Sequence, residues 1–383
     1  MRRLKVKMIY LDYAATTPLD EDVLNAMKPY LTSCFGNPSS QHRFGREAAN
    51  AVLNARDEIA SLMGVKAEEL YFTSGGTEAG NTALKGVCLA NKDRGRHIIV
   101  SAMEHPALLE SAKDMAKQGF EVNFLNPDES GIISADAVKE AIRPDTVFVS
   151  VMAANNEVGT IQPISEIYSV CKERGVFLYC DCVQTAGVLP FDKFPADGIG
   201  FSAHKFYGPK GFGGLYMRGN ARFTRLISGG GQERGLRGGT TYVAGAVGCA
   251  RALSNAVNAM ESNNKKVAAL RDKFVDLVTS NICGVQLNGD MALRLPANAN
   301  ISFDGCDGEQ ILFALDLKGI AVSTGSACSS GAVTPSHVLL SMGLGERRAK
   351  SAVRFTFGKY NTQKEVEETV EVLTQAVNKI RKN

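Results

Sequence analysis

The 383-residue sequence has no apolar run long enough to cross a bilayer, and its first eight residues lack the apolar core of a signal peptide. It also has little net charge, because 43 lysine and arginine residues against 40 aspartate and glutamate residues leave +3. Such a balance favours neither a nucleic-acid surface nor a membrane surface. We therefore expect a cytoplasmic protein that binds neither nucleic acid nor membrane.

The nine cysteines contain no pair at the two-residue gap that is typical of zinc fingers and ribbons. Their odd number and wide scatter predict reduced thiols and no disulfide framework. Cys180 and Cys182 are the closest pair, and in a strand both thiols lie on one face while Asp181 lies on the other. Two thiols in the core are the simplest interpretation, which leaves Asp181 as the residue of interest.

Short β-rich runs alternate with helix-sized segments through the first part of the chain. The runs cover residues 70–72, 97–100, 121–125, 146–151, 176–179, 198–201 and 214–217. Segments such as 106–119 and 164–174 have helical patterns and end in glycine or just before it. This alternation predicts an α/β fold with a mostly parallel, seven-stranded sheet flanked by helices.

The length of the chain exceeds what one core usually supports, so we expect two domains. Residues 220–280 turn helical after a glycine-rich loop, new short strands begin near 284, and a charged helix covers 363–381. These features predict a smaller α+β domain. We assign residues 15–260 to the large domain and residues 1–14 with 261–383 to the small one.

Several residues with reactive or ligand-binding side chains follow these strands, at the sheet edge where ligands bind in α/β proteins. The turn 73–79 has two glycines between a strand and a helix, so its N–H groups and the helix dipole suit a phosphate, although many such turns are only structural. His105, the cluster 155–159 and Asp181 with Gln184 each follow a strand as well. A structural histidine, a plain turn and an arginine partner for Asp181 are the alternative interpretations.

Lys205 ends the apolar run 198–201 within the segment SAHKFYGPKG, residues 202–211. A lysine screened from water near other cationic groups can act as an amine nucleophile, whereas most loop lysines are only solvated. A phosphate cradle, a carboxylate suited to a protonated pyridine nitrogen and a lysine able to form a Schiff base together describe a site for pyridoxal phosphate (PLP).

Cys328 lies among small and hydroxyl-bearing residues between Ser323 and Gly331. A free cysteine is normally a small core residue, but these neighbours provide almost no bulk to bury it. The alternative is an exposed thiol that acts as a nucleophile.

The motifs occur in an order that resembles the cysteine desulfurases of the NifS and IscS type, which are class-V aminotransferases of PLP fold type I. They are DYAATTP (12–18), GNPSSQH (36–42), GGTE (75–78), EH (104–105), NNEVG (155–159), residues 181–184, SAHKFYGPKG (202–211), GGGQERGLRGGT (229–240) and GSAC (325–328). The resemblance covers nearly the whole chain. It implies a homodimer that takes sulfur from L-cysteine, leaves L-alanine, and holds the sulfur as a persulfide for acceptors such as an iron–sulfur scaffold.

The resemblance also implies a role for each matching residue. Lys205 would form the Schiff base with PLP, His105 would stack on the ring and assist proton transfer, and Cys328 would carry the sulfur on a loop over 323–337. Asp181 would pair with the pyridine nitrogen and Gln184 with the ring hydroxyl. The phosphate would be held by Gly76, Thr77, Ser202, His204 and, from the partner subunit, Thr240. Cofactor and substrate would meet Asn156, and the substrate carboxylate would meet Arg354 and either Asn37 or Asn155.

Other activities share most of these parts. A selenocysteine lyase, another PLP-dependent lyase or aminotransferase, and a cofactor-binding scaffold without catalysis remain alternatives at this stage. The sequence does not identify the sulfur acceptor. It also leaves open whether Cys328 ligates a transient iron–sulfur cluster.

Overall fold

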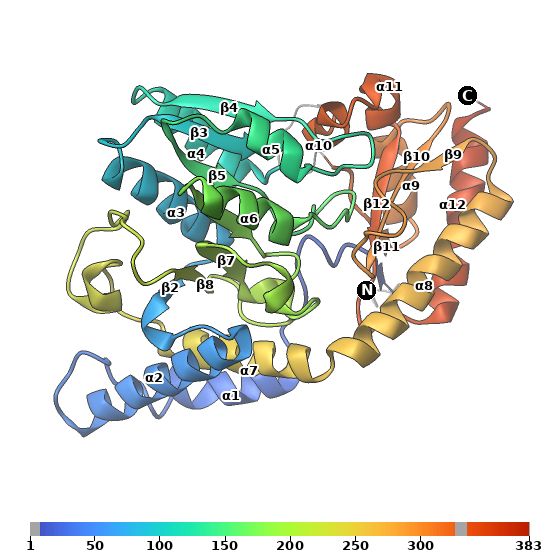
Figure 1. Cartoon of the computed structure of the whole chain (residues 1–383). Coiled ribbons are helices and arrows are strands. Elements are labelled where there is room, and N and C mark those ends of the chain that lie inside the picture. Colours follow the sequence, from blue (N-terminus) through green and yellow to red (C-terminus); the bar gives the residue numbers. More distant parts are fainter. Residues whose placement is uncertain (1–7, 326–334, 383) are drawn as a thin grey trace.

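A central seven-stranded sheet organises the larger part of the protein, as the computed structural model shows (Figure 1). The structure describes residues 8–325 and 335–382. Across the sheet the order is β2 (Leu70–Thr73), β8 (Gly213–Met217), β7 (Gly198–Ser202), β6 (Phe177–Asp181), β5 (Thr146–Ser150), β3 (His97–Ser101) and β4 (Glu121–Leu125). Strand β8 is antiparallel to both of its neighbours, and the other adjacent pairs are parallel.

Helices cover both faces of this sheet, which explains why β3, β5 and β7 are buried at every residue. On one face, α3 (Gly76–Ala90) and α4 (Pro106–Ala116) pack against the strands, with Tyr179 in their core. The other face meets a second core, to which α1 (Glu21–Leu31), α2 (Arg43–Met63), α5 (Ala135–Ala141), α6 (Ile164–Glu173) and α7 (Val243–Asn258) contribute. Cys180 and Cys182 lie in this second core with their sulfur atoms 3.7 Å apart, as the strand period predicts.

A smaller α+β unit contains most of the remaining elements. Its antiparallel sheet has the order β12 (Ala352–Thr356), β10 (Asn298–Phe303) and β9 (Val285–Leu287). Around this sheet lie α8 (Met260–Asn281), α9 (Gly308–Asp316), α10 (His337–Ser341), α11 (Gly345–Lys350) and α12 (Gln363–Ile380). Its core includes the aromatic pair Phe274 and Phe355, with ring centroids 4.6 Å apart.

The two ends of the chain meet in this smaller unit. Strand β1 (Ile9–Tyr10) pairs in parallel with β11 (Ile320–Ala321), and Ile9 packs in the same core as α12. Helix α8 follows directly after α7 and extends from the larger unit to lie beside α12 (Figure 1). The α/β fold with its mostly parallel sheet confirms the sequence prediction, and the domain limits at 15–260 remain our proposal.

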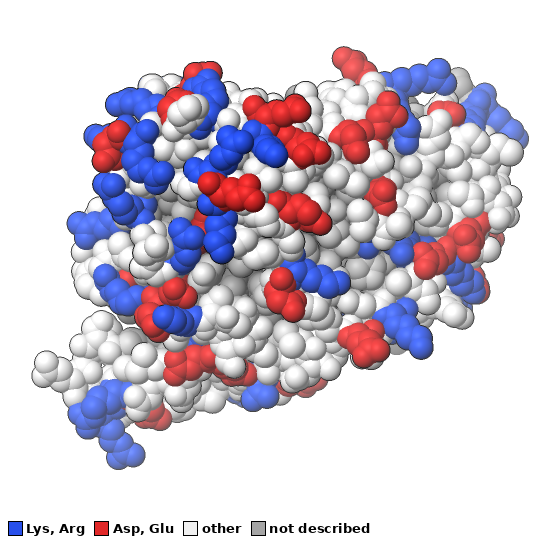
Figure 2. Space-filling view, in the orientation of Figure 1, with Lys and Arg blue, Asp and Glu red and all other residues white. Residues whose placement is uncertain are grey.

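Charged side chains of both signs are interspersed over the face shown in Figure 2. Lysine and arginine are most frequent at the left end of that view, and acidic side chains lie among them. Arg143, for example, forms ion pairs with Glu121 and Asp145 at 2.6 and 3.0 Å. In the described part of the chain, no helix combines the length and the apolarity that a membrane crossing requires.

Candidate active site

Lys205 lies at the carboxyl end of β7, in the 3-10 turn Ala203–Lys205. Its Nζ donates hydrogen bonds to the carbonyl oxygens of Ala14 and Ala15, at 2.5 and 2.9 Å. Nearby, the Thr17 hydroxyl accepts a hydrogen bond from the N–H of Tyr207 at 2.8 Å. Segment 14–17 therefore lies against the lysine, a contact that the DYAATTP motif signalled but that the sequence analysis did not assign.

Tyr207 adopts a left-handed backbone conformation, with φ +67°, two residues after Lys205. This conformation is costly for a bulky side chain and persists where the surroundings fix it, often at functional sites. The hydrogen bonds of the Tyr207 N–H to Thr17 and of the Asp20 N–H to the Tyr207 carbonyl supply that fixation. The backbone after Lys205 is thus held in one conformation.

Asp181 is the last residue of β6, where it is buried. Burial raises the pKa of its carboxyl to about 6, against the opposing effects of the Val183 N–H, which donates to Oδ1 at 2.8 Å, and of the Lys205 charge. A cationic group beside this carboxylate would offset its desolvation. Gln184 follows in the same turn, and its Nε2 donates to the Ala14 carbonyl at 3.0 Å.

His105 precedes α4 and acts as its N-cap, because its Nδ1 accepts the N–H of Ala107 at 3.1 Å. Burial lowers the pKa of this histidine, and the charges of Lys205 and His337 lower it further. A neutral ring that accepts at Nδ1 carries its proton on Nε2. His105 therefore presents an N–H donor from its far side.

The glycine turn before α3 lies against the ends of β6 and β7. Gly75 has φ +144°, which favours glycine, and a Cβ atom there would lie 3.3 Å from the Ser202 hydroxyl. A Cβ on Gly76 would lie 2.5 Å from a methyl group of Val183, so this turn has no room for a larger residue. Thr77 is in the first turn of α3, whose leading N–H groups lack acceptors within the helix and favour an anion.

His204 lies against the N-terminal segment. Its Nδ1 is 3.1 Å from the Thr16 hydroxyl. Burial lowers the pKa of His204 to about 4, with contributions from the charges of Lys205 and Lys210. The ring is therefore neutral near pH 7 and can serve as a hydrogen-bond donor or acceptor to a phosphate.

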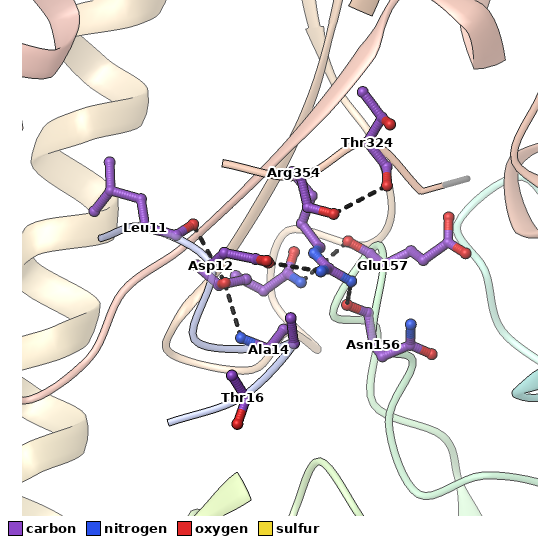
Figure 3. Close-up of polar contacts among 12 residues, drawn as sticks. Leu11, Asp12, Ala14, Thr16, Asn156, Glu157, Thr324 and Arg354 are labelled. Atoms are coloured by element: carbon purple, nitrogen blue, oxygen red, sulfur yellow. Dashed lines mark hydrogen bonds and ion pairs between the residues drawn. The ribbon is translucent and has the colours of Figure 1, made fainter. Parts of the chain in front are cut away.

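Arg354 approaches from the smaller unit on β12 and is buried. Its guanidinium lies between two groups, donating to Asp12 Oδ1 at 2.8 Å and to the carbonyl of Asn156 at 3.1 Å (Figure 3). The Nε of Arg354 is also buried, and it has no acceptor among the described residues. The Nε–H of this arginine is thus a buried donor whose hydrogen bond a ligand carboxylate could complete.

Asn155, which we considered as a ligand of the substrate carboxylate, makes its hydrogen bonds within the protein. Its amide donates to the Met103 carbonyl at 2.9 Å, and its Oδ1 accepts the N–H groups of Glu157 and Val158 at 2.8 and 3.0 Å. Asn155 is completely buried and shapes the turn that presents Asn156. Among the described contacts, its polar atoms are occupied within the protein.

Three predicted site residues remain, of which the structure describes Asn37 and Thr240. Asn37 is exposed between α1 and α2, and its side chain accepts the N–H of Ser39 at 2.9 Å. Thr240 is exposed in the loop after the 3-10 turn Gln232–Gly235. Cys328 lies outside the described residues. Within the described ranges, no group of three His, Cys, Asp or Glu side chains is arranged to hold a metal ion.

The arrangement fits PLP in its chemistry. Asp181 is a buried carboxylate that a pyridinium would stabilise, and Lys205 supplies an amine. Helix α3 begins at Gly76, and the N–H groups of its first turn, which lack acceptors within the helix, suit a phosphate. A cavity of about 450 Å³ adjoins Lys205 and Gln184 and is bounded on its other side by residues of α7, α8 and β12. The lining of this cavity does not include Asp181, His105 or His204, so the cavity lies beside these residues.

Comparison with known proteins defines the class to which this fold and site belong. The family model of the class-V aminotransferases matches residues 9–369, so the chain belongs to that family, whose cofactor is PLP. Cysteine desulfurase IscS of Dictyoglomus turgidum is 46% identical over 375 residues, which cover 97% of this chain and 95% of that protein.

Two solved structures are similar over nearly the same extent. One, a NifS-like protein, superposes with a TM-score of 0.91 at 37% identity and covers 97% of this chain and 99% of its own. Another, SspA in complex with cysteine, has a TM-score of 0.82 at 34% identity and covers 92% of this chain and 100% of its own.

Proposed function

We propose that this chain is a cysteine desulfurase that uses PLP to remove sulfur from L-cysteine, with L-alanine and a persulfide on Cys328 as products. The observation that carries the proposal is the gathering of Asp181, His105 and His204 around Lys205. Burial raises the pKa of Asp181 and lowers that of both histidines, and the Lys205 charge opposes the first effect and adds to the second. The relatives named cysteine desulfurase, of similar length, support the choice among PLP reactions.

When bound, PLP supplies a carbonyl that reacts with amines and a ring that withdraws electrons. Asp181 would hold the pyridine nitrogen in its protonated form, and Gln184 would meet the ring hydroxyl. His105 would cover one face of the ring. The phosphate ligands would be Gly76, Thr77, Ser202, His204 and, across the dimer interface, Thr240.

Lys205 would then serve as the base that removes the substrate Cα proton. The carbonyl oxygens of Ala14 and Ala15 support this role, because both accept hydrogen bonds from the charged Nζ once it has taken up the proton. The Nε2–H of His105 points away from the Nδ1 atom of the same imidazole ring, which makes the N-cap contact. It is suited to orient the substrate or to exchange a proton with it.

Arg354 would bind the substrate carboxylate through its Nε edge, which has no acceptor among the described residues. Asp12 and the Asn156 carbonyl fix the rest of the guanidinium, so the arginine loses little freedom when the substrate binds. The side chain of Asn156 lies next to it in sequence and would contact both substrate and cofactor.

The Cys328 thiolate would attack the sulfur atom of the bound cysteine. A sulfur–sulfur bond forms, the substrate Cβ–S bond breaks, and its electron pair remains on the carbon, which is protonated to give alanine. The persulfide then passes to an acceptor protein, for which an iron–sulfur scaffold is our proposal. We further propose a cytoplasmic homodimer.

Persulfide labelling tests the function directly. The purified holoenzyme is incubated with L-cysteine, and the sulfur added to each cysteine is located by alkylation and mass spectrometry while alanine is measured in parallel. We expect persulfide on Cys328 and loss of both signals in Cys328→Ala, whereas Cys283→Ala, which removes an exposed thiol elsewhere, keeps both. Alanine and sulfide release that survive in Cys328→Ala would refute the proposal.

A further inference from the structure

Glu157 is a buried acid in the NNEVG turn, and the proposed reaction does not use it. Only 3% of the residue is exposed. Its backbone is fixed, since its N–H donates to Asn155 Oδ1 at 2.8 Å and its carbonyl accepts from the amides of Asn298 and Asn300 at 3.0 and 3.3 Å. In Figure 3 its side chain extends away from the Arg354 guanidinium.

The carboxylate of Glu157 lies against Gly325, the last described residue before segment 326–334. A Cβ atom on Gly325 would come within 2.0 Å of Glu157 Oε2 and 2.9 Å of the Ser336 Cβ. Real Cβ contacts are longer than this, so alanine at 325 would displace the carboxylate or the chain. Gly325 has no left-handed φ. The close approach of the chain at 325 to the Glu157 carboxylate therefore explains why this residue is glycine. A need for a left-handed backbone conformation does not explain it.

The same carboxylate holds the chain where its description resumes. Ser336 Oγ donates to Glu157 Oε2 at 2.5 Å. The same Ser336 hydroxyl accepts the Leu339 N–H at 3.2 Å and so forms the N-cap of α10. The next residue, His337, has its Nε2 3.1 Å from the Glu104 carbonyl, directly before His105. Burial of Glu157 raises its pKa, while Ser336, His337 and Arg354 oppose that effect.

These contacts place one side chain at both ends of the segment that contains Cys328. Residues 325 and 336 meet at the carboxylate of Glu157, and the adjacent residue in the turn, Asn156, binds Arg354 through its carbonyl. A fixed separation of the two ends restricts where the residues between them can reach. We propose that Glu157 is a positioning residue, which sets both ends of segment 326–334 relative to Arg354 and thereby directs Cys328 to the substrate.

This inference rests on the proposed function, and a single-turnover experiment separates the two. Holoenzyme of the wild type, Glu157→Ala and Glu157→Gln is mixed with L-cysteine, and persulfide on Cys328 is followed in time. Binding of L-cysteine is followed through the change in cofactor absorbance. We expect Glu157→Ala to form persulfide about tenfold to about hundredfold more slowly, with binding within about twofold, because a misplaced reacting group reduces rate more than affinity.

Glu157→Gln retains an oxygen that accepts from Ser336 and should recover most of the rate. In the cofactor-free protein, hydrogen exchange at the Leu339 amide should accelerate in Glu157→Ala, since Ser336 loses its fixed orientation. Ser134→Ala is the matched control, as it removes a serine N-cap from a different helix, α5. It should leave persulfide formation unchanged.

A double variant tests the close approach of Gly325. Gly325→Ala alone should slow persulfide formation as Glu157→Ala does, while Gly325→Ala with Glu157→Ala should be no slower than either single change, because the space is then vacant. Wild-type rates in Glu157→Ala would overturn the inference. Absence of persulfide in the wild type would instead overturn the proposed function.

Discussion

Asp181 shows how a single buried residue prepares a site for its ligand. Without a cationic partner in contact, its ionised form is disfavoured by burial, so the carboxyl takes up protons at a pH where an exposed aspartate is ionised. A ligand that brings a positive charge to this carboxylate removes that cost. The unfavourable environment of Asp181 in the free protein thus becomes affinity in the complex.

This predicts a distinct pH dependence for the cofactor-free protein. The pKa of Asp181 rises from 3.8 to about 6 on folding, so its contribution to stability is complete below pH about 4 and is lost as the pH rises through about 6. Asp181→Asn, whose side-chain oxygen can still accept the Val183 N–H, should therefore exceed the wild type in free energy of unfolding by about 3 kcal/mol at pH 8 and match it near pH 4.

Denaturant unfolding of both cofactor-free proteins across this pH range measures the difference. Addition of PLP supplies the control, because it should reverse the order at pH 8 by stabilising the wild type more. A difference that does not change with pH would contradict the prediction.

Arg354 permits a second prediction about one residue. Arg354→Lys loses the planar edge that we assign to the substrate carboxylate, so KM for L-cysteine should rise about tenfold or more while kcat falls less. Asp12→Asn retains an oxygen acceptor for the guanidinium and serves as the control, with KM within a few-fold of the wild type. Steady-state alanine formation measures both; an unchanged KM in Arg354→Lys would remove Arg354 from substrate binding.

Among the elements, the 3-10 turn Gln232–Gly235 is held by a buried ion pair and a buried hydrogen bond of Glu233. Glu233 in this turn accepts both guanidinium nitrogens of Arg56 of α2, at 2.8 and 2.7 Å, and the N–H of Phe72 of β2 at 2.8 Å, and all of these partners are buried. The guanidinium carbon also lies 4.2 Å from the ring centre of Phe72. Glu233 and Arg234 both adopt left-handed conformations, which these contacts offset.

Removal of this anchor should destabilise the protein strongly. Glu233→Ala leaves the Arg56 charge buried without its partner, so we expect a loss of about 3 to about 5 kcal/mol in the free energy of unfolding. Glu110→Ala breaks the exposed pair with Lys113 and should cost less than about 1 kcal/mol. Denaturant unfolding compares the two; equal losses would show that the buried pair has no special weight.

The elements were predictable from sequence to the extent that their signals are local. The seven strand runs and the helices at 106–119 and 164–174 appear within a few residues of their expected bounds, since burial of parallel strands and glycine at helix ends both act over short distances. The strand period alone predicts that Asp181 and Cys180 lie on opposite faces of the sheet. Helix α4 ends at Ala116, three residues before Gly119, so the glycine signal locates the end of the helix only to within a few residues.

The contacts that complete the site were not predictable in this way. Lys205 meets Ala14 and Ala15 from about 190 positions away, and Arg354 meets Asp12 from 342 positions away. No periodicity specifies such pairs. Asn155 and Asn156 are adjacent in one motif, yet only the structure separates a residue that shapes the turn from one that faces Arg354.

At the scale of the whole molecule, we predict that two chains share each site. Thr240 is exposed, and the resemblance implies that it contacts the cofactor bound by the partner subunit. A heterodimer of Lys205→Ala with Thr240→Val should then contain one complete site, because the chain with intact Lys205 receives Thr240 from its partner. We expect about half of the wild-type activity per dimer, well above either variant homodimer.

Alanine formation by the isolated heterodimer, purified through two different tags, measures this recovery. A mixture of the two homodimers that has not exchanged subunits provides the baseline. If Thr240 acted within its own chain, the heterodimer would recover no more activity than Thr240→Val contributes by itself.

The pairing of β1 with β11 and of Asp12 with Arg354 has a consequence for the order of events during synthesis. Residues 9–12 precede the segment that contacts Lys205, and their partners in β11 and β12 are made more than 300 residues later, so these residues stay unpaired while the large sheet assembles. Contacts of such sequence separation form slowly. A nascent chain that stops before Arg354 therefore contains Lys205 and the glycine turn but lacks the arginine that we assign to the substrate, and the proposed site is completed only after β12 has been made.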